Sequence, residues 1–427
     1  MAIAVRADDI DVDELVKSDR VHRLVYTDPA IFEAEMERIF ERSWVFVAHE
    51  SEIARSGDFK TTFIGRNPVI ITRDSDAHIR VLMNRCMHRG AVVCREERGN
   101  TSAFRCGYHG WTYNTRGDLA IVTARGGYGP EFDQASLGLI PAPRLESYRG
   151  FYFASMNPTV EPLVDHLGKA KTYLDLALDA SPEGEIEVSA GLSKYAAPAN
   201  WKLQVENWID HYHAPVTHEI AFATKTRRGE RQAASLSRLE DGHRAEDIWD
   251  GVSTFGHGHG TTQKLYLAGQ RNGPAAHGGA EYARALGRSY GSDRAREILN
   301  SDVQLVLFPN FFIQPNRHHF RVLRPVAVDR TEITAYPYTL KGAPDEMNRF
   351  QVQDLSWWAS AAGFGQPDDV EAFARCQEGL QVRIAEWVLF MRGVHQEEVM
   401  PDGEIRGEGA NEATQRGIYR EWQRLMR

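Results

Sequence analysis

The sequence lacks both a long apolar run and a basic tract. No stretch approaches the roughly 18 apolar residues of a membrane-spanning helix. The N-terminal stretch is acidic and has no apolar segment like that of a signal peptide. We therefore expect a cytoplasmic protein that does not enter a membrane. The net charge is −9 and no basic cluster offsets it, which argues against binding to nucleic acid.

Cysteines and nucleotide-binding motifs are also scarce. Of the four cysteines, Cys86 and Cys106 belong to the motifs described next, while Cys94 and Cys376 are expected to be buried thiols in a reducing compartment. No Gly-x-Gly-x-x-Gly motif follows an expected strand, so the chain has no recognisable site for a nicotinamide or a flavin. If it carries out redox chemistry, its electrons must come from another protein.

Two short boxes combine cysteine with histidine. They are Cys86-Met87-His88 and Cys106-Gly107-Tyr108-His109, with 17 residues between His88 and Cys106. Two thiolates and two imidazoles at this spacing can hold one compact metal centre, either an iron–sulfur cluster or zinc. Zinc modules usually pair Cys with Cys and His with His, so a Cys and a His in each box favour the iron–sulfur cluster.

The boxes resemble the Rieske domain, which binds a 2Fe–2S cluster. The flanking residues Asn84-Arg85, Arg89-Gly90 and Gly110-Trp111 agree with that resemblance. It implies that the two cysteines bind one iron and the two histidines bind the other. No second cysteine directly follows Gly90 or Cys106, and this absence implies the lower-potential type of domain found in oxygenases.

A second candidate site lies in the segment 200–218. Glu206, Asp210 and His213 are at helical spacing, on roughly one face. His218 is five residues beyond His213, which is about 140° further round an ideal helix. Both rings can reach one ion only if the helix is broken between them, and Pro215 is a candidate cause of that break. The alternative is a helix with polar surface histidines.

This segment resembles, residue for residue, the mononuclear iron motif Glu-Asn-x-x-Asp-x-Tyr-His-x4-His of ring-hydroxylating oxygenase α subunits, and the resemblance covers nearly the whole chain. Two histidines need an anionic third ligand to complete the 2-His-1-carboxylate triad. Asp368, Asp369 and Glu371 lie at the start of an expected helix and are the candidates. The resemblance selects Asp369 and leaves Asp368 as a neighbour or helix cap.

The resemblance implies an enzyme, the large terminal component of an aromatic-ring-hydroxylating system that acts as a dioxygenase or a monooxygenase. Electrons from NAD(P)H would reach the cluster through a separate reductase, with or without a ferredoxin, and then pass to Fe(II), which activates O2.

Members of this family form trimers of α subunits, with or without small β subunits. In such a trimer Asp210 would contact His213 of its own chain and His109 of the next. The alternatives are a Rieske demethylase or other monooxygenase on the same scaffold, and a pure electron carrier.

The segment Glu206–His213 is closer to the benzoate, anthranilate, salicylate and terephthalate group than to the naphthalene group, which has an extra residue before its Asp. We therefore expect an aromatic carboxylate as the substrate. A buried carboxylate needs a cation or several donors. The candidate cations are Arg317, Arg321, Arg383 and Arg392, whereas Arg324 is expected to serve the fold.

The chain is predicted to have an α+β fold. Asp28 can cap a helix that begins at Pro29, and alternating stretches such as 59–64, 69–72 and 79–83 predict antiparallel strands with the boxes on loop tips. Residues 163–180 are predicted to form a helix. Residues 222–300 are predicted to form a pocket wall and lid, in which 256–260 are a mobile loop.

The expected domains are an N-terminal leader and helix that pack on the catalytic domain (1–41), an inserted antiparallel β Rieske domain (42–160), and a catalytic domain of helices and antiparallel sheet (161–427).

Overall fold

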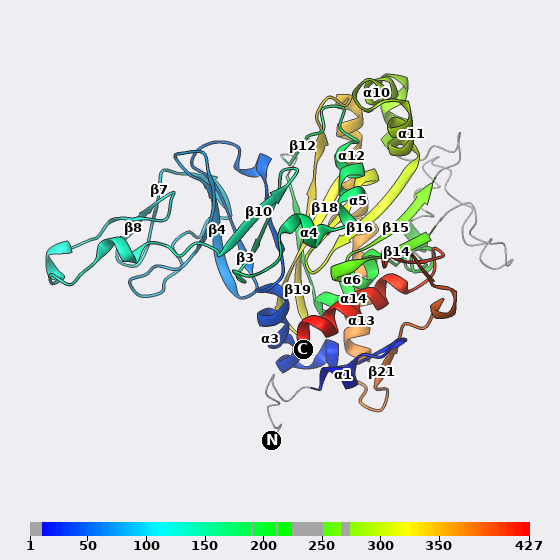
Figure 1. Ribbon diagram of the computed structural model, residues 1–427, viewed down its shortest axis with the longest axis horizontal. Helices are drawn as coiled ribbons and strands as arrows, with labels where there is room; N and C mark the ends of the chain where they lie inside the picture. Colours follow the sequence, from blue (N-terminus) through cyan, green and yellow to red (C-terminus); the bar gives the residue numbers. More distant parts are fainter. Residues whose placement is uncertain (1–10, 189–190, 211, 222, 224–250, 266–273) are drawn as a thin grey trace. The chain divides into compact units, whose positions relative to one another are not determined.

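The computed structural model describes residues 11–188, 191–210, 212–221, 223, 251–265 and 274–427, and it divides into two compact units. The smaller unit is Met36–Asp165, and the larger one combines Met1–Glu35 with His166–Arg427. The smaller unit is thus inserted into the sequence of the larger. Figure 1 follows the chain in colour through both units.

The smaller unit is built from antiparallel strands. The alternating stretches predicted at 59–64, 69–72 and 79–83 are confirmed as strands. Gly65 and Arg66 join the first two of them in a two-residue turn, and Gly65 has a φ of +55°, as such hairpin turns require. The strands of this unit are β2 (Val45–His49), β3 (Asp58–Ile64), β4 (Asn67–Arg73), β5 (Ile79–Met83), β6 (Arg98–Asn100), β7 (Ala103–Arg105), β8 (Thr112–Asn114), β9 (Leu119–Ile121), β10 (Arg144–Tyr148) and β11 (Phe151–Ser155). They form sheets of order β10-β11-β2, β5-β4-β3-β6 and β7-β8-β9.

The larger unit is organised around a nine-stranded antiparallel sheet of order β13-β19-β18-β17-β16-β15-β14-β23-β22. Apolar side chains of its central strands, such as Leu305, Phe311 and Phe320, are fully buried and form the core. The strands are β13 (Ser193–Ala197), β14 (Gly251–Thr254), β15 (Gly260–Leu265), β16 (Ser301–Leu307), β17 (Phe311–Gln314), β18 (His319–Ala327), β19 (Arg330–Pro337), β22 (Glu398–Val399) and β23 (Ile405–Gly407). Two further pairs are β1 (Arg20–His22) with β21 (Trp387–Leu389) and β12 (Ile186–Glu187) with β20 (Thr339–Leu340).

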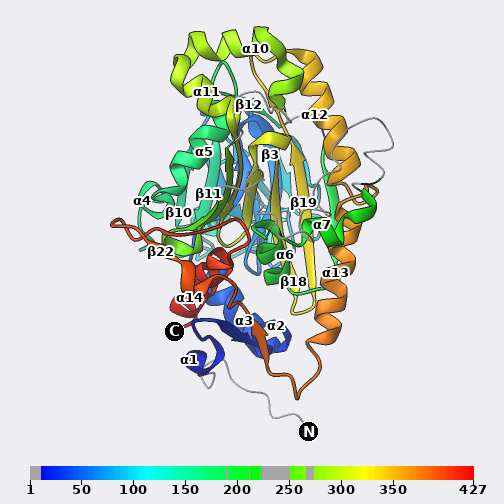
Figure 2. The same ribbon diagram turned by 90° about the vertical axis from the view of Figure 1, so that its right-hand side faces the viewer.

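Helices cover this sheet. Helices α12 and α13 pack near its β13–β19 edge, α14 packs on β14 and β15, and α10 contacts α11 and α12 (Figure 2). The helices are α1 (Val12–Leu15), α2 (Leu24–Thr27), α3 (Pro29–Glu35), α4 (Leu163–Leu167), α5 (Ala170–Leu178), α6 (Trp201–Trp208), α7 (Ala214–Thr217), α10 (Pro274–Tyr290), α11 (Ser292–Asn300), α12 (Asp345–Trp358), α13 (Gln366–Gly379) and α14 (Ala413–Met426). Within the described part of the chain, no helix is both long and apolar enough to cross a bilayer.

Some predicted elements differ from the structure. The cap at Asp28 is confirmed, because its Oδ1 accepts hydrogen bonds from the Ala30 and Ile31 amides. The single helix predicted over 163–180 was wrong, because Gly168, with a φ of +46°, separates α4 from α5. In the region 222–300, residues 251–265 form a hairpin of the large sheet and 274–300 form two helices. Residues 222, 224–250 and 266–273 lie outside the described residues, so the lid expected there has no structural account.

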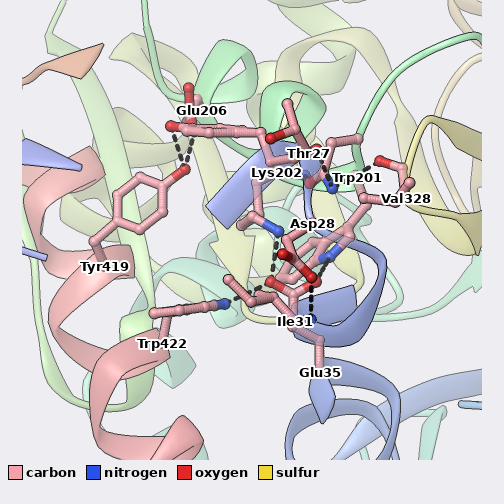
Figure 3. A network of polar contacts seen from close by, with 12 residues as sticks. Thr27, Asp28, Ile31, Glu35, Trp201, Lys202, Glu206, Val328, Tyr419 and Trp422 are labelled. Atoms are coloured by element: carbon pink, nitrogen blue, oxygen red, sulfur yellow. Dashed lines mark hydrogen bonds and ion pairs between the residues drawn. The ribbon is translucent and has the colours of Figure 1, made fainter. Parts of the chain in front are cut away.

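Two segments far apart in sequence meet on α6 (Figure 3). The buried Glu35 carboxylate at the end of α3 lies 2.5 Å from Lys202 Nζ. It also accepts hydrogen bonds from the indoles of Trp201, at 2.8 Å, and Trp422 of α14, at 2.7 Å. A buried ion pair is tolerated only when such additional donors satisfy it. The first turn of α6 is therefore fixed between the N-terminal segment and the last helix.

Candidate functional site

The two Cys-His boxes form similar loops in the smaller unit. In the first, the Cys86 amide donates to Ala91 O at 2.8 Å, and the Gly90 amide donates to Cys86 O at 2.9 Å. The second repeats this pattern: the Cys106 amide donates to Trp111 O, and the Gly110 amide donates to Cys106 O. Both glycines have a φ near +75°, a conformation that favours glycine. Each loop therefore holds its cysteine by its own backbone hydrogen bonds.

The donor atoms of these loops converge as a cluster site would need. Cys86 and Cys106 are buried, and the rings of His88 and His109 lie 4.5 Å apart between centroids. The Nδ1 atoms of both histidines are buried and have no hydrogen-bond partner among the described residues. Buried nitrogens of this kind need an explanation, and a metal ligand role is one. Two thiols and two such nitrogens fit the Rieske donor set.

Aromatic side chains surround these donors. Tyr113 is fully buried, its hydroxyl lies 3.3 Å from Cys86 Sγ, and it accepts a hydrogen bond from the Met87 amide. The Trp111 ring stacks on His88 at 4.8 Å. Burial, and after it the neighbouring His109 and Arg89, lowers the pKa of His88, which favours the neutral imidazole that binds metals.

The second candidate site follows α6, and its geometry corrects the predicted helix break. Helix α6 ends at Trp208, and a separate turn, α7, begins after His213. The prediction that Pro215 breaks a helix between His213 and His218 was therefore wrong, because Pro215 lies in the first turn of α7, where proline is tolerated. Asp210 also lies beyond α6, so the single helical face expected for it and His213 does not exist. His211 is outside the described residues.

His213, His218 and Asp369 nevertheless come together. Asp369 Oδ1 lies 3.5 Å from His213 Nε2 and 3.2 Å from His218 Nε2. Ligand atoms about 2.1 Å from one ion, at angles between octahedral and tetrahedral values, would be about 3.0–3.5 Å apart. Asp369 and His218 are buried, and one potential ligand atom of each of the three residues lies within 4.8 Å of the others. The three side chains thus fit a 2-His-1-carboxylate metal site.

A second carboxylate faces the outer nitrogen of each of these imidazoles. Asp210 Oδ1 lies 3.7 Å from His213 Nδ1, and Asp368 Oδ2 lies 3.4 Å from His218 Nδ1. Asp210 also accepts hydrogen bonds from the amides of Tyr212 and His213, which closes the turn after α6. A carboxylate hydrogen-bonded to the outer nitrogen, as Asp368 is to His218, fixes the tautomer and orientation of a metal-binding imidazole. The separation between Asp210 and His213 Nδ1 is longer than a hydrogen bond.

The sequence interpretation gave no role to Asn207. Its Nδ2 lies 3.1 Å from both His213 Nε2 and Asp369 Oδ1, so one amide contacts two of the three candidate ligands. The Glu-Asn-x-x-Asp motif contains an Asn at this position, but the motif does not identify the atoms that the Asn amide contacts.

The site favours an ionised carboxylate. Burial alone would raise the pKa of Asp369, but the His213 and His218 rings hold it well below its usual range. Burial alone would lower the pKa of His213, but the carboxylates of Asp210 and Asp369 raise it to about 10. A buried group of this composition attracts positive charge, as a site for a divalent cation must.

Glu206 and two buried tyrosines form a triad that supports α6 just before Asn207. Glu206 Oε1 accepts a hydrogen bond from the Tyr26 hydroxyl at 2.8 Å. It also accepts one from the Tyr419 hydroxyl, and Figure 3 shows this pair. The two hydroxyls lie 2.6 Å from each other. Burial raises the pKa of Glu206 to about 7, although both tyrosines and Lys202 act in the opposite direction. The N- and C-terminal segments therefore hold the end of α6 as well as its beginning.

Two other sequence predictions meet the structure here. Cys94 is buried as expected, but the prediction of a buried Cys376 was wrong, because Cys376 is exposed beside the buried stripe of α13. The run 256–260 closes the β14–β15 hairpin, and His259 is buried with its Nδ1 accepting from the Phe308 amide.

Comparisons with known proteins agree with both sites. A model of the Rieske 2Fe–2S domain matches residues 43–133, and a model of the ring hydroxylating alpha subunit catalytic domain matches residues 184–427. The anthranilate 1,2-dioxygenase large subunit of Acinetobacter baylyi is 36% identical, over 95% of this chain and 89% of that protein. The toluate 1,2-dioxygenase subunit alpha of Pseudomonas putida is also 36% identical, over 86% of this chain and 82% of its own.

A solved structure confirms the fold. A naphthalene 1,2-dioxygenase variant bound to phenanthrene superposes with a TM-score of 0.85 and 27% identity, over 99% of this chain and 95% of that one. The predicted α+β fold, with an antiparallel β Rieske domain and a catalytic domain of helices and antiparallel sheet, is confirmed. The two domains imply a Rieske cluster and a mononuclear iron. The chain belongs to the Rieske-type ring-hydroxylating oxygenases, as an α subunit that carries the catalytic domain of that family.

Proposed function

We propose that this chain is the terminal component of a multicomponent system that hydroxylates or cis-dihydroxylates the ring of an aromatic carboxylate. The convergence of His213, His218 and Asp369 carries this proposal, since an electron carrier would need the Cys-His boxes alone. O2 would be the co-substrate, and a separate reductase, with or without a ferredoxin, would deliver electrons from NAD(P)H. The anthranilate and toluate specificities of the two relatives support the substrate class.

The ligand assignment follows from the donor sets. Cys86 and Cys106 would hold one iron of the cluster, and His88 and His109 the other. His213, His218 and Asp369 would hold the mononuclear Fe(II), which would supply the chemistry that activates O2. In this chain, Asp368 orients the His218 ring and Asp210 lies beside the His213 ring. Asn207 donates to Asp369 Oδ1 and would keep that contact when iron takes the lone pair of His213 Nε2.

The subunits would assemble as a trimer, with or without small β subunits, in the cytoplasm. Asp210 is the proposed link between subunits, with its carboxylate on His213 of its own chain and on His109 of the next. Two features support this role: the carboxylate lies beside His213, and it is partly exposed, with 21% of its side chain accessible.

The experiment that tests the function is reconstitution with a surrogate reductase. We expect about three irons per chain, two in the cluster and one in the mononuclear site. Benzoate and anthranilate should stimulate oxygen uptake, with a diol or hydroxylated acid identified by mass. An iron content of two per chain without oxygen uptake would indicate an electron carrier, and formaldehyde released from N-methyl or O-methyl substrates would indicate a demethylase.

The proposed link is tested by Asp210→Asn, which nearly preserves shape and removes the charge. Both metals should stay bound and the cluster should remain reducible, because Asp210 is not a ligand. Single-turnover product formation should fall by about 100-fold, which is the upper range for removing the partner of a metal-binding imidazole. Normal electron delivery in the variant, or full activity in an isolated monomer, would exclude the link.

A further inference from the structure

Arg321 is an unusual cation in the larger unit. It lies in β18, only 5% of its surface is exposed, and its guanidinium is 4.7 Å from the centroid of the Trp208 ring. No carboxylate and no other acceptor among the described residues pairs with this guanidinium, and its buried Nε has no hydrogen-bond partner there. A buried charge without a counter-ion is costly, and an anionic ligand would offset that cost by pairing with the guanidinium.

The other candidate arginines differ from Arg321. Arg317 forms an ion pair with Asp354 at 3.0 Å. Arg383 and Arg392 are exposed, and Arg392 lies over the Tyr212 ring. Arg324, on the same strand, pairs with Glu332 at 2.9 Å. Arg321 is therefore the one of these five arginines that is both buried and unpaired within the described part of the chain.

Strand register places Arg321 on one face of the sheet together with other polar groups. Arg321 lies opposite Ala335, which in turn lies opposite Ser193, and Tyr195 is two residues along the same strand. Residues directly opposite each other, and residues two apart on a strand, share a face. His319, two residues before Arg321, is on this face too. The Tyr195 hydroxyl and both His319 ring nitrogens are buried without partners among the described residues.

This face is close to the candidate iron ligands. Trp208, which contacts the guanidinium, directly follows Asn207, and the Asn207 amide contacts His213 and Asp369. The charges of Arg321 and Asp369 both act on the pKa of Tyr195. Burial raises that pKa to about 12, the Arg321 guanidinium lowers it, and the Asp369 carboxylate raises it. Both charged groups therefore act on one buried hydroxyl.

The chemistry of this group fits a planar anion attached to an aromatic ring. A guanidinium can donate two parallel hydrogen bonds to a carboxylate. Burial, with Arg321 and Arg317 beside it, holds the pKa of His319 well below its ordinary value, so that ring is a neutral donor and acceptor. Trp208 and Phe312 pack against each other and supply aromatic surface.

We propose that Arg321 binds the carboxylate of the substrate, with His319 and Tyr195 as additional hydrogen-bonding groups on the same face of the sheet. This inference rests on the proposed function and specifies how its substrate class is selected. Arg321 is then the residue that makes the site prefer an aromatic acid to the corresponding neutral compound.

The test measures equilibrium binding of benzoate and of benzamide to the iron-loaded protein under argon, where no turnover occurs. Wild type should prefer benzoate. In Arg321→Gln, the Kd for benzoate should rise roughly 100-fold, because two charge-assisted hydrogen bonds are lost, and the Kd for benzamide should stay within about threefold. Arg321→Lys keeps the charge without the two-pronged geometry and should weaken benzoate binding by about 10-fold.

Arg324→Gln is the matched control, since it removes the same group from the opposite face of the same strand, and it should bind both probes as wild type does. Iron content and circular dichroism show whether each variant is folded. If Arg321→Gln does not fold, the Kd of Arg321→Lys for benzoate alone tests the proposal.

Benzoate binding at wild-type strength in a folded Arg321 variant overturns this inference and leaves the proposed substrate class intact. A wild-type protein that binds benzamide or toluene but no aromatic acid overturns the proposed substrate class, and this inference with it.

Discussion

The two candidate metal centres are built in different ways. All four proposed cluster ligands lie between Cys86 and His109, on two loops that close through their own backbone hydrogen bonds. The mononuclear site instead brings α7 next to Asp368 and Asp369 of α13, about 150 residues away in sequence. The first centre therefore depends on local loop geometry, whereas the second depends on the packing of the whole larger unit. Substitutions should affect each centre without disabling the other.

The strongest test of this independence is Asp369→Ala. Removing the anionic member of the triad should eliminate mononuclear iron and turnover while the visible spectrum of the cluster persists. Asp368→Ala is the matched control, and it should lower turnover by about 10–100-fold because it only orients His218. Metal analysis and oxygen uptake measure both effects. Full activity in Asp369→Ala, with activity lost in Asp368→Ala, would move the ligand by one position.

The converse test changes the cluster. In His109→Cys, a thiolate replaces one of the two neutral imidazoles, so the reduction potential should fall by roughly 100 mV or more, about half of the effect of both imidazoles. Redox titration measures this shift, and the mononuclear iron content should not change. A potential equal to that of wild type would show that His109 is not a cluster ligand.

A third test probes the packing on which the mononuclear site depends. The pKa of Glu206 is raised by burial to about 7, from an ordinary 4.5, so the folded state holds a proton that the unfolded chain releases. Glu206 therefore makes its full contribution to the free energy of unfolding below about pH 4.5. That contribution is lost as the pH rises through about 7. In Glu206→Gln, the free energy of unfolding should fall less between pH 5.5 and 7.5, measured by urea titration. Equal pH dependence in both proteins would mean that Glu206 is ionised throughout.

The smallest expected effect is that of Tyr113→Phe. The Tyr113 hydroxyl lies 3.3 Å from Cys86 Sγ, and a hydrogen bond to a cluster sulfur stabilises the reduced state. Its loss should lower the potential on the order of tens of millivolts, less than in His109→Cys. If the loops alone set the potential, redox titration will find no difference.

The contrast between the centres also explains what sequence reasoning could predict. The Cys-His boxes are close in sequence, and their spacing indicated one metal centre. The alternating stretches around them indicated that the boxes lie on loops between strands. Asp369 was selected only by resemblance, since nothing local separates it from Asp368. The double contact of Asn207 and the tyrosines on Glu206 could not be predicted, because Tyr26 and Tyr419 are 393 residues apart. The error at Pro215 arose from treating α6 and α7 as one helix.

The Glu35 network has a consequence for how the protein is made. Trp422 is synthesised 387 residues after Glu35, so the α3 carboxylate gains this partner only after α14 has been made. Every strand of the smaller unit has been synthesised long before then. Domains generally fold as units during translation, in order from the N-terminus. The iron–sulfur loops can therefore form before α14 has been synthesised, whereas the contact of α14 with Glu35 beside α6 cannot.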